Sequence, residues 1–281
     1  IEPSYFSLSW FLEHKKYEEA TNIAGPLVSM LIVAGRLAEA TKLLNSLSSI
    51  VSGLKNEVLS AVNENFIAYI NYLLGFESVA KKHFEASDGI ITKLDPDCPV
   101  HCPTVSSYYC KFLLDTGNSN AALDRALKTA AWRKQKAWQI TVDSTSLLAS
   151  DLLVLGLILL RRGDYANAKV NLDKQIELFK SADDRLYLPA GLNARATYYI
   201  KVKNYPCAMA DLREALEISQ RTGAKFGQWE SFLNFSQLHL AKSEHQAARR
   251  FLDKAMSLEG MADYKFRDRE IEQLQNSLAQ I

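Results

Sequence analysis

Proline, glycine and cysteine are all scarce in this sequence of 281 residues, which contains 7, 12 and 4 of them. A disordered or low-complexity chain would be rich in proline and glycine, so their scarcity favours a folded chain. Four unevenly spaced cysteines do not form the framework of a small disulfide-stapled domain. The hydrophobic fraction of 48% is ample for a continuous core, in one elongated domain or two compact ones.

An excess of either charge is also missing, because 33 Lys and Arg residues face 32 Asp and Glu residues. We therefore expect neither nucleic acid nor an anionic membrane as the main partner. The longest apolar run, from Leu152 to Leu160, covers only half a bilayer, so no membrane-spanning helix is expected. We find no signal peptide and expect a cytoplasmic chain. Because it begins at Ile1 and not at Met, we expect a fragment of a longer protein or a processed form.

A repeat with a step of 40 residues is the clearest pattern present. Three kinds of position keep this step: a small residue at Gly156, Ala196 and Ser236, an alanine at Ala168, Ala208 and Ala248, and a leucine at Leu172, Leu212 and Leu252. We interpret each unit as two helices, in which the small residue of the first meets the alanine of the second at close approach. Neighbouring units then bury the faces that a single hairpin leaves open.

The same frame extends upstream through Val28, Ala68 and Cys110, with steps of 40, 42 and 46 residues up to Gly156. The longest step contains a polar segment, 139–144, which we predict to be a loop. The pattern predicts an all-α, right-handed superhelical solenoid of stacked antiparallel hairpins. We expect 1–25 to be the end of a truncated preceding repeat, and a break or kink at the Gly25-Pro26 pair. Residues 26–281 should hold about six hairpins, closed by a capping helix over 267–280.

The small–aromatic–alanine–large–alanine order resembles the tetratricopeptide repeat, in a form longer than its usual ~34 residues. Three segments resemble a narrower group, the C-terminal repeat domains of bacterial signal-transducing NTPases of the STAND/NACHT type. LPAGLNARA at 188–196 is similar to the "LPRGLLARA" of that group, ADLREALEI at 210–218 to its "ADLDEALEIA", and YKFRDREI at 264–271 to its closing "GYHRRDxEL".

The resemblance implies a sensor whose repeats bind a ligand or a foreign protein, in some cases in defence against phage. It also implies an NTPase or effector domain outside this chain, because the sequence has no P-loop of the form G-x-x-x-x-G-K-[ST]. Two other functions stay open: a stand-alone adaptor that assembles protein complexes, and a peptide or small-molecule receptor of a regulatory protein.

Catalytic and metal-binding patterns are weak. The cluster Cys98, His101, Cys102 and Cys110 has zinc-like residue types, but we interpret it as a loop with incidental thiols and one core cysteine. Because no Ser/His/Asp or Cys/His arrangement is present, we expect no catalytic residues, no metal and no cofactor in this chain.

Arg195 takes an inward position that Leu155 and Phe235 hold in the neighbouring units. A lone buried charge would be costly, so a partner is required. Asp211 on the partner helix is the natural candidate, and we predict an ion pair inside the hairpin.

The concave side of the solenoid, lined by the first helix of each hairpin, is the remaining place for function. Counted from the small residue of each unit, the residues predicted to face it are Asn65, Tyr69, Tyr72, Ser107, Lys111, Leu153, Leu157, Arg161, Asn193, Thr197, Lys201, Leu233 and Gln237. We expect this mixture of amide, aromatic and cationic groups to bind a protein or peptide of some acidic character. The predicted centre is Asn193, Thr197, Lys201 and Gln237, with Arg161 nearby.

Overall fold

The structure, a computed structural model, describes residues 1–94, 106–136 and 144–280, and within them every regular element is helical. The helices are α1 (Glu2–Glu13), α2 (Tyr17–Val33), α3 (Leu37–Leu54), α4 (Glu57–Leu73), α5 (Glu77–Leu94), α6 (Ser106–Asp115), α7 (Ser119–Lys136), α8 (Ser144–Arg161), α9 (Tyr165–Ser181), α10 (Leu188–Lys201), α11 (Tyr205–Thr222), α12 (Lys225–Ala241), α13 (His245–Met256) and α14 (Asp268–Ala279), with a short 3₁₀ turn, η1 (Lys265–Arg267). The predicted all-α repeat solenoid is confirmed.

Six hairpins can be counted in the described residues: α2–α3, α4–α5, α6–α7, α8–α9, α10–α11 and α12–α13. Short polar side chains begin two of the second helices. Asp164 accepts a hydrogen bond from the Asn167 amide at 3.2 Å, and Asn204 accepts one from the Cys207 amide at 3.3 Å. Pro189 lies in the first turn of α10, where its missing N–H costs nothing.

The small residues of the 40-residue repeat lie where the two helices of a hairpin meet. A Cβ atom added to Gly156 would lie only 2.7 Å from a methyl carbon of Leu172, so α8 and α9 approach at glycine distance. The other repeated small positions are wholly buried: Ala168, Ala196, Ala208, Ser236 and Ala248. The repeat therefore records helix-to-helix contact within each hairpin.

Of the break or kink predicted at the Gly25-Pro26 pair, the break is wrong, because α2 continues through both residues from Tyr17 to Val33, and the kink stays a prediction. Gly25 has a packing role. A Cβ atom at this position would lie 3.3 Å from the ring of Phe66, so a residue without a side chain lets α4 pack close to α2. Only α1 precedes the first hairpin, and the predicted boundary at residue 25 falls inside a helix. The predicted loop over 139–144 lies outside the described residues except for Ser144, which begins α8. The predicted capping helix corresponds to α14.

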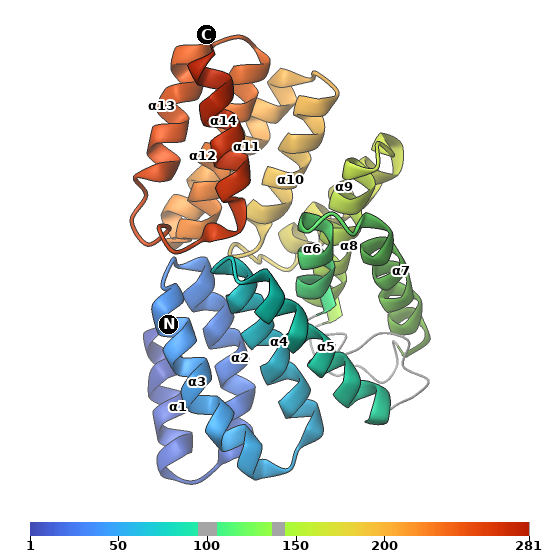
Figure 1. Cartoon of the computed structure of the whole chain (residues 1–281), viewed down its shortest axis with the longest axis vertical. Helices are drawn as coiled ribbons and strands as arrows, with labels where there is room; N and C mark the ends of the chain where they lie inside the picture. The colour runs from blue at the N-terminus through green and yellow to red at the C-terminus, as the bar shows by residue number, and fades with distance from the viewer. Residues whose placement is uncertain (95–105, 137–143, 281) are drawn as a thin grey trace.

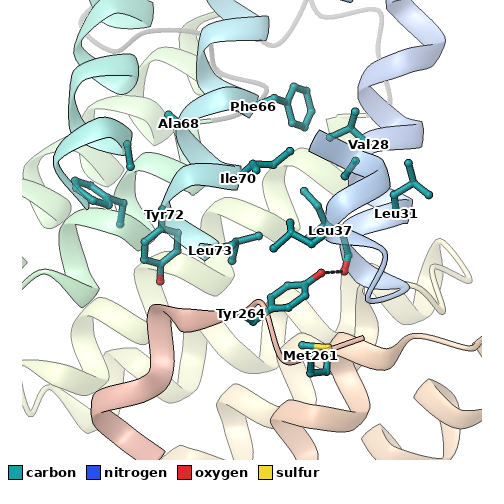
Figure 2. Close-up of a cluster of buried hydrophobic side chains, with 14 of the residues drawn as sticks. Val28, Leu31, Leu37, Phe66, Ala68, Ile70, Tyr72, Leu73, Met261 and Tyr264 are labelled. Atoms are coloured by element: carbon teal, nitrogen blue, oxygen red, sulfur yellow. Dashed lines mark hydrogen bonds between the residues drawn. The ribbon is translucent and has the colours of Figure 1, made fainter. Parts of the chain in front are cut away.

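The solenoid curves until its last hairpin returns to its first ones, as Figure 1 shows with α10–α14 lying against the end of α1–α5. The contact is made by the turns that end α2 and α4, by the start of α12 and by the segment after α13. Met261 and Tyr264 of that segment are buried in one core with Leu31 and Leu73, and the Tyr264 hydroxyl donates to the Ile32 carbonyl at 2.6 Å (Figure 2). The C-terminal part therefore shares its core with the N-terminal hairpins.

Candidate functional site

The curvature encloses a central cavity of about 2030 Å³, which we define by its lining: the first helices α2, α4, α6, α8, α10 and α12, together with residues 265–273. Every first helix contributes side chains to it. The cavity is therefore the concave face that the repeat pattern predicts. None of the described helices is both long and apolar enough to cross a membrane.

Aromatic rings form the wall between α4, α6 and α12. Tyr69 stacks on Tyr108 with ring centroids 4.0 Å apart and planes 9° apart. Phe266 lies 5.1 Å from Tyr72 and stacks on Phe226 at 6.1 Å. Burial raises the pKa values of the Tyr69, Tyr72 and Tyr108 hydroxyls, so these side chains stay neutral. This wall offers flat apolar contact area with a few hydroxyl donors.

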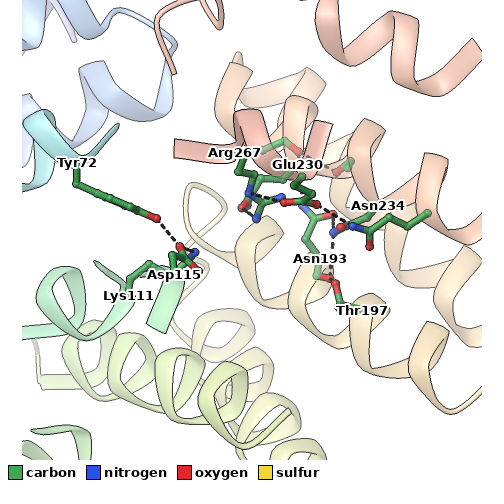
Figure 3. A network of polar contacts seen from close by, with 12 residues as sticks. Tyr72, Lys111, Asp115, Asn193, Thr197, Glu230, Asn234 and Arg267 are labelled. Carbon is green, nitrogen blue, oxygen red and sulfur yellow. Dashed lines mark hydrogen bonds and ion pairs between the residues drawn. The ribbon is translucent and has the colours of Figure 1, made fainter. Parts of the chain in front are cut away.

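Asp115 is the polar centre on one side of the cavity (Figure 3). Its carboxylate accepts hydrogen bonds from the Tyr72 hydroxyl and the Lys111 ammonium, and Arg161 lies 3.5 Å away. Burial raises the pKa of Asp115, but the charge and hydrogen bond of Lys111, together with the Tyr72 bond, outweigh it and hold the pKa below its usual value. One carboxylate thus serves two cations at the end of α6.

A second ion pair lies opposite, where Arg267 donates to Glu230 at 2.8 Å (Figure 3). Glu230 belongs to α12 and is only 9% exposed. Burial raises its pKa, and the nearby Arg267 counteracts this only in part. Burial also lowers the pKa of Arg267, but Glu270, Glu230 and Asp115 outweigh it, so that the guanidinium stays charged. Glu230 depends on this partner, because an unpaired buried carboxylate is costly.

Amides join α10 to α12 beside this pair. Asn234 donates to the Asn193 backbone carbonyl at 3.2 Å and lies 3.4 Å from its side-chain oxygen. Asn193 reaches the Gly227 carbonyl at 3.5 Å, and Thr197 donates to the Asn193 carbonyl at 3.1 Å. Asn193 is only 3% exposed. It lines the cavity, but its side chain is already engaged in holding two helices together.

Most of the residues predicted to face the groove line the cavity: Tyr69, Tyr72, Ser107, Lys111, Leu153, Leu157, Arg161, Asn193, Thr197, Lys201 and Gln237. Lys201 is exposed there, and Gln237 donates to Glu270 of α14 at 2.7 Å. Leu233 is fully buried and lies outside the lining.

The prediction that Asn65 faces the groove is wrong. It is fully buried on α4 and does not line the cavity, and both of its amide atoms are without a hydrogen-bond partner. Phe66 and Tyr69 of the same helix form the wall instead, because both rings pack on Tyr108 of α6.

Several lining residues are not among those predicted, and some carried a usable signal. Asp115 stands five residues after the small position Cys110, the same offset that places Arg161 and Lys201 in the groove. Glu230 lies one helical turn before the offsets that were counted on α12. Phe266 and Arg267 follow the last hairpin, where the repeat gives no register.

Arg195 lies in the predicted hairpin-internal pair, with two bonds of 2.8 Å to Asp211. A third bond of 2.8 Å reaches Asp173, so the guanidinium joins α9, α10 and α11. Its pKa is raised above the usual value, chiefly by the hydrogen bond with Asp211, so the charge is permanent. The three bonds hold the second helix of one hairpin to both helices of the next.

Three members of the possible zinc cluster, Cys98, His101 and Cys102, lie outside the described residues. Among the residues that the structure describes, no group of three His, Cys, Asp or Glu side chains could hold a metal ion. Cys110 is buried on α6, and burial raises the pKa of its thiol to about 12. It is a core residue, as expected from its small position in the repeat.

No protein-family model matches this chain, and no curated protein sequence matches it. Solved structures are similar at low sequence identity. One is a STAND protein (signal transduction ATPase with numerous domains) with a tetratricopeptide repeat sensor from Pyrococcus horikoshii; it has a TM-score of 0.53 and 17% identity over 92% of this chain and 39% of that chain.

Two further structures are Pseudomonas aeruginosa pilF, with a TM-score of 0.47 and 16% identity, and the yeast Sti1 TPR2AB domain in complex with pHSP90, with a TM-score of 0.38 and 16% identity. The similar regions cover 91% and 93% of this chain, and 99% of each of the two solved chains. Scores this low do not establish a shared fold. The Pyrococcus structure does establish the fold alone, an all-α solenoid of the tetratricopeptide type, and the chain spans 39% of that protein's length.

Proposed function

We propose that this chain is a protein-interaction scaffold that binds a polypeptide in its central cavity. The observation that carries the proposal is the cavity itself, about 2030 Å³ lined by all six first helices. Small-molecule pockets usually measure ~300–1,000 Å³, so this space suits a polypeptide segment better than a metabolite. Its wall combines aromatic area with cationic groups, of which Lys201 is exposed, and these can bind apolar and acidic side chains of a guest.

The finer proposal is a sensor: the repeat region of a larger signal-transducing ATPase that responds when the cavity is filled. It is supported by the fold shared with the Pyrococcus protein, whose repeats are described as a sensor, and by the resemblance of 188–196, 210–218 and 264–271. We assign no catalysis to this chain, and the ATPase would lie outside it. A reducing bacterial cytoplasm suits the free thiols of Cys110 and Cys207.

A peptide selection tests the cavity directly. A phage-displayed library of random dodecapeptides is selected on the immobilised chain, and enriched peptides are measured against the double variant Thr197→Arg with Lys201→Glu. Both positions line the cavity, and Lys201 is exposed there, so stability should change by less than about 1 kcal/mol. Asn193 is left intact because it holds α10 to α12.

The matched control is Lys174→Glu, the same charge reversal on an exposed position of the second helix α9. Enriched peptides should bind the cavity variant at least tenfold more weakly, which is ~1.4 kcal/mol, and the control variant unchanged. Equal affinity for the native chain and the cavity variant would place binding elsewhere and contradict the proposal, as would a selection that enriches no peptide.

A further inference from the structure

The segment at 261–267, which we call the strap, has two kinds of side chain. Met261 and Tyr264 point into the core shared with α2 and α4, where they are 4% and 1% exposed. Phe266 and Arg267, which end the strap, line the central cavity instead. The strap thus anchors itself in the core and places a ring and a guanidinium in the space that the proposed function assigns to a guest.

The groups that receive this pair form a built subsite on two other elements. The Arg267 guanidinium donates to Glu230 at 2.8 Å and lies 5.9 Å from the centre of the Trp229 ring. Phe266 lies among three rings, 5.1 Å from Tyr72, 5.8 Å from Trp229 and 6.1 Å from Phe226. A buried carboxylate beside aromatic faces is the chemistry that recognises a guanidinium next to a ring.

We propose that the strap is an internal ligand: its Phe266–Arg267 pair fills a cavity subsite for an aromatic residue followed by arginine, and a polypeptide that carries such a pair displaces it. The inference rests on the proposed function, since it takes the cavity as the binding site. It adds the chemistry of one part of the guest and the contact that keeps the subsite closed until the guest arrives.

The Phe266–Arg267 end of the strap can leave the cavity while the anchor at Met261 and Tyr264 stays in the core. Lys265, which separates the anchor from this end, is exposed, and the described hydrogen bond from this end to α12 is the single one from Arg267 to Glu230. Segments with few buried contacts open locally while the rest of a protein stays folded. An attached strap also has a high effective concentration, so a separate peptide must outcompete it and binds the native chain weakly.

The test uses a synthetic peptide of residues 261–270, MADYKFRDRE, with blocked ends, added to the full chain. In the variant Phe266→Ala with Arg267→Gln the internal strap loses its cavity contacts but keeps Met261 and Tyr264. Titration calorimetry should show at least tenfold tighter peptide binding to this variant than to the native chain. A control peptide with the same two replacements should bind neither, and adding Glu230→Gln to the variant should abolish the gain.

Equal peptide affinity for the native chain and the variant, or no binding to a variant that circular dichroism shows to be folded, would overturn the proposal. If the variant fails to fold, the native chain decides. With millimolar peptide, hydrogen exchange of strap amides should rise at least threefold while α11 is unchanged, and an unaltered strap would refute displacement. The library selection probes the wall at Thr197 and Lys201, so failure there is distinguishable from failure at Glu230.

Discussion

The Tyr264 hydroxyl donates a hydrogen bond of 2.6 Å to the backbone carbonyl of Ile32, 232 residues earlier in the chain. The bond is buried, and it links the last turn of α2 to the segment that follows α13. Close backbone packing accompanies it, because a Cβ atom on Gly260 would lie 2.6 Å from the Gly35 carbonyl oxygen. The two ends of the repeat array thus pack so closely that their backbones are in contact.

Tyr264→Phe should lower the free energy of unfolding by about 1 kcal/mol, the usual cost of one lost internal hydrogen bond. The loss stays moderate because the Ile32 carbonyl keeps a second donor, the Gly35 amide at 3.1 Å. Urea denaturation measures the change. The matched control is Tyr205→Phe, whose exposed hydroxyl reaches the Ala241 carbonyl at 3.2 Å and should matter less. Equal effects of the two replacements would mean that the long-range bond adds little.

Ala208→Leu should destabilise the protein by about 1–3 kcal/mol, because Ala208 is fully buried between the helices of its hairpin and has no room for three more carbons. Ala210→Leu provides the control, since it adds the same atoms at an exposed position of the same helix. Thermal melting should show a clear fall for the first variant and almost none for the second. Unchanged melting of Ala208→Leu would show that α10 and α11 are not in tight contact there.

We expect the stability difference between the native chain and the Glu230→Gln variant to depend on pH. Its folded pKa is raised by burial, so between the unfolded and folded pKa values the native state keeps a proton that the unfolded state has lost. The stabilisation is complete below the pKa of ~4.3 that Glu230 has in the unfolded chain. It is lost as the pH rises through the higher pKa of the folded chain. The stability of the native chain relative to Glu230→Gln should therefore fall from pH 4 to pH 7.

Glu244 gives the opposite sign as a control. The hydrogen bond from Lys242, and then that from His239, lowers its pKa, so its stabilisation is present at neutral pH and is lost as the pH falls. Relative to Glu244→Gln, the native chain should gain stability as the pH rises. Urea titrations at several pH values measure both differences, and a Glu230 difference that rises with pH would show that the Arg267 pair outweighs burial.

Cys110 should react with iodoacetamide at least tenfold more slowly than Cys207 in the folded protein at pH 8. Cys110 is 2% exposed and its pKa is raised to about 12, so almost no thiolate is present, whereas Cys207 is half-buried at the start of α11. Peptide mass mapping over time measures both rates. In urea the two rates should converge, and equal rates in the native state would contradict the burial of α6.

The sequence was informative wherever a physical demand recurs in every hairpin. The close contact of α8 with α9 and of α10 with α11 needs a small residue at the same place, so Gly156 and Ala196 are one repeat step apart. Arg195 could be paired with Asp211 because a buried charge requires a partner within reach. Most of the residues predicted from the same register line the cavity, because the buried face of a helix fixes which face is left for the groove.

Features that occur only once could not be predicted from the repeat. The strap has no equivalent in the other units, so the sequence pattern indicated neither the anchor of Tyr264 nor the placement of Arg267 against Glu230. Pro26 looked like a helix break because local propensity is judged without tertiary context, whereas α2 is held by packing on both sides. Asn65 occupies the same offset as Asn193 but is covered, since the rings of α4 and α6 fill that part of the wall.

An open repeat array can unzip from either end, unit by unit, because each unit contacts only its neighbours. The contact between α2 and the segment at 257–264 removes that route, since neither terminal hairpin can leave before the other is released. Unfolding should then be a single cooperative step. Refolding should be slow for a helical protein, because the joint forms only after a loop of more than two hundred residues has closed.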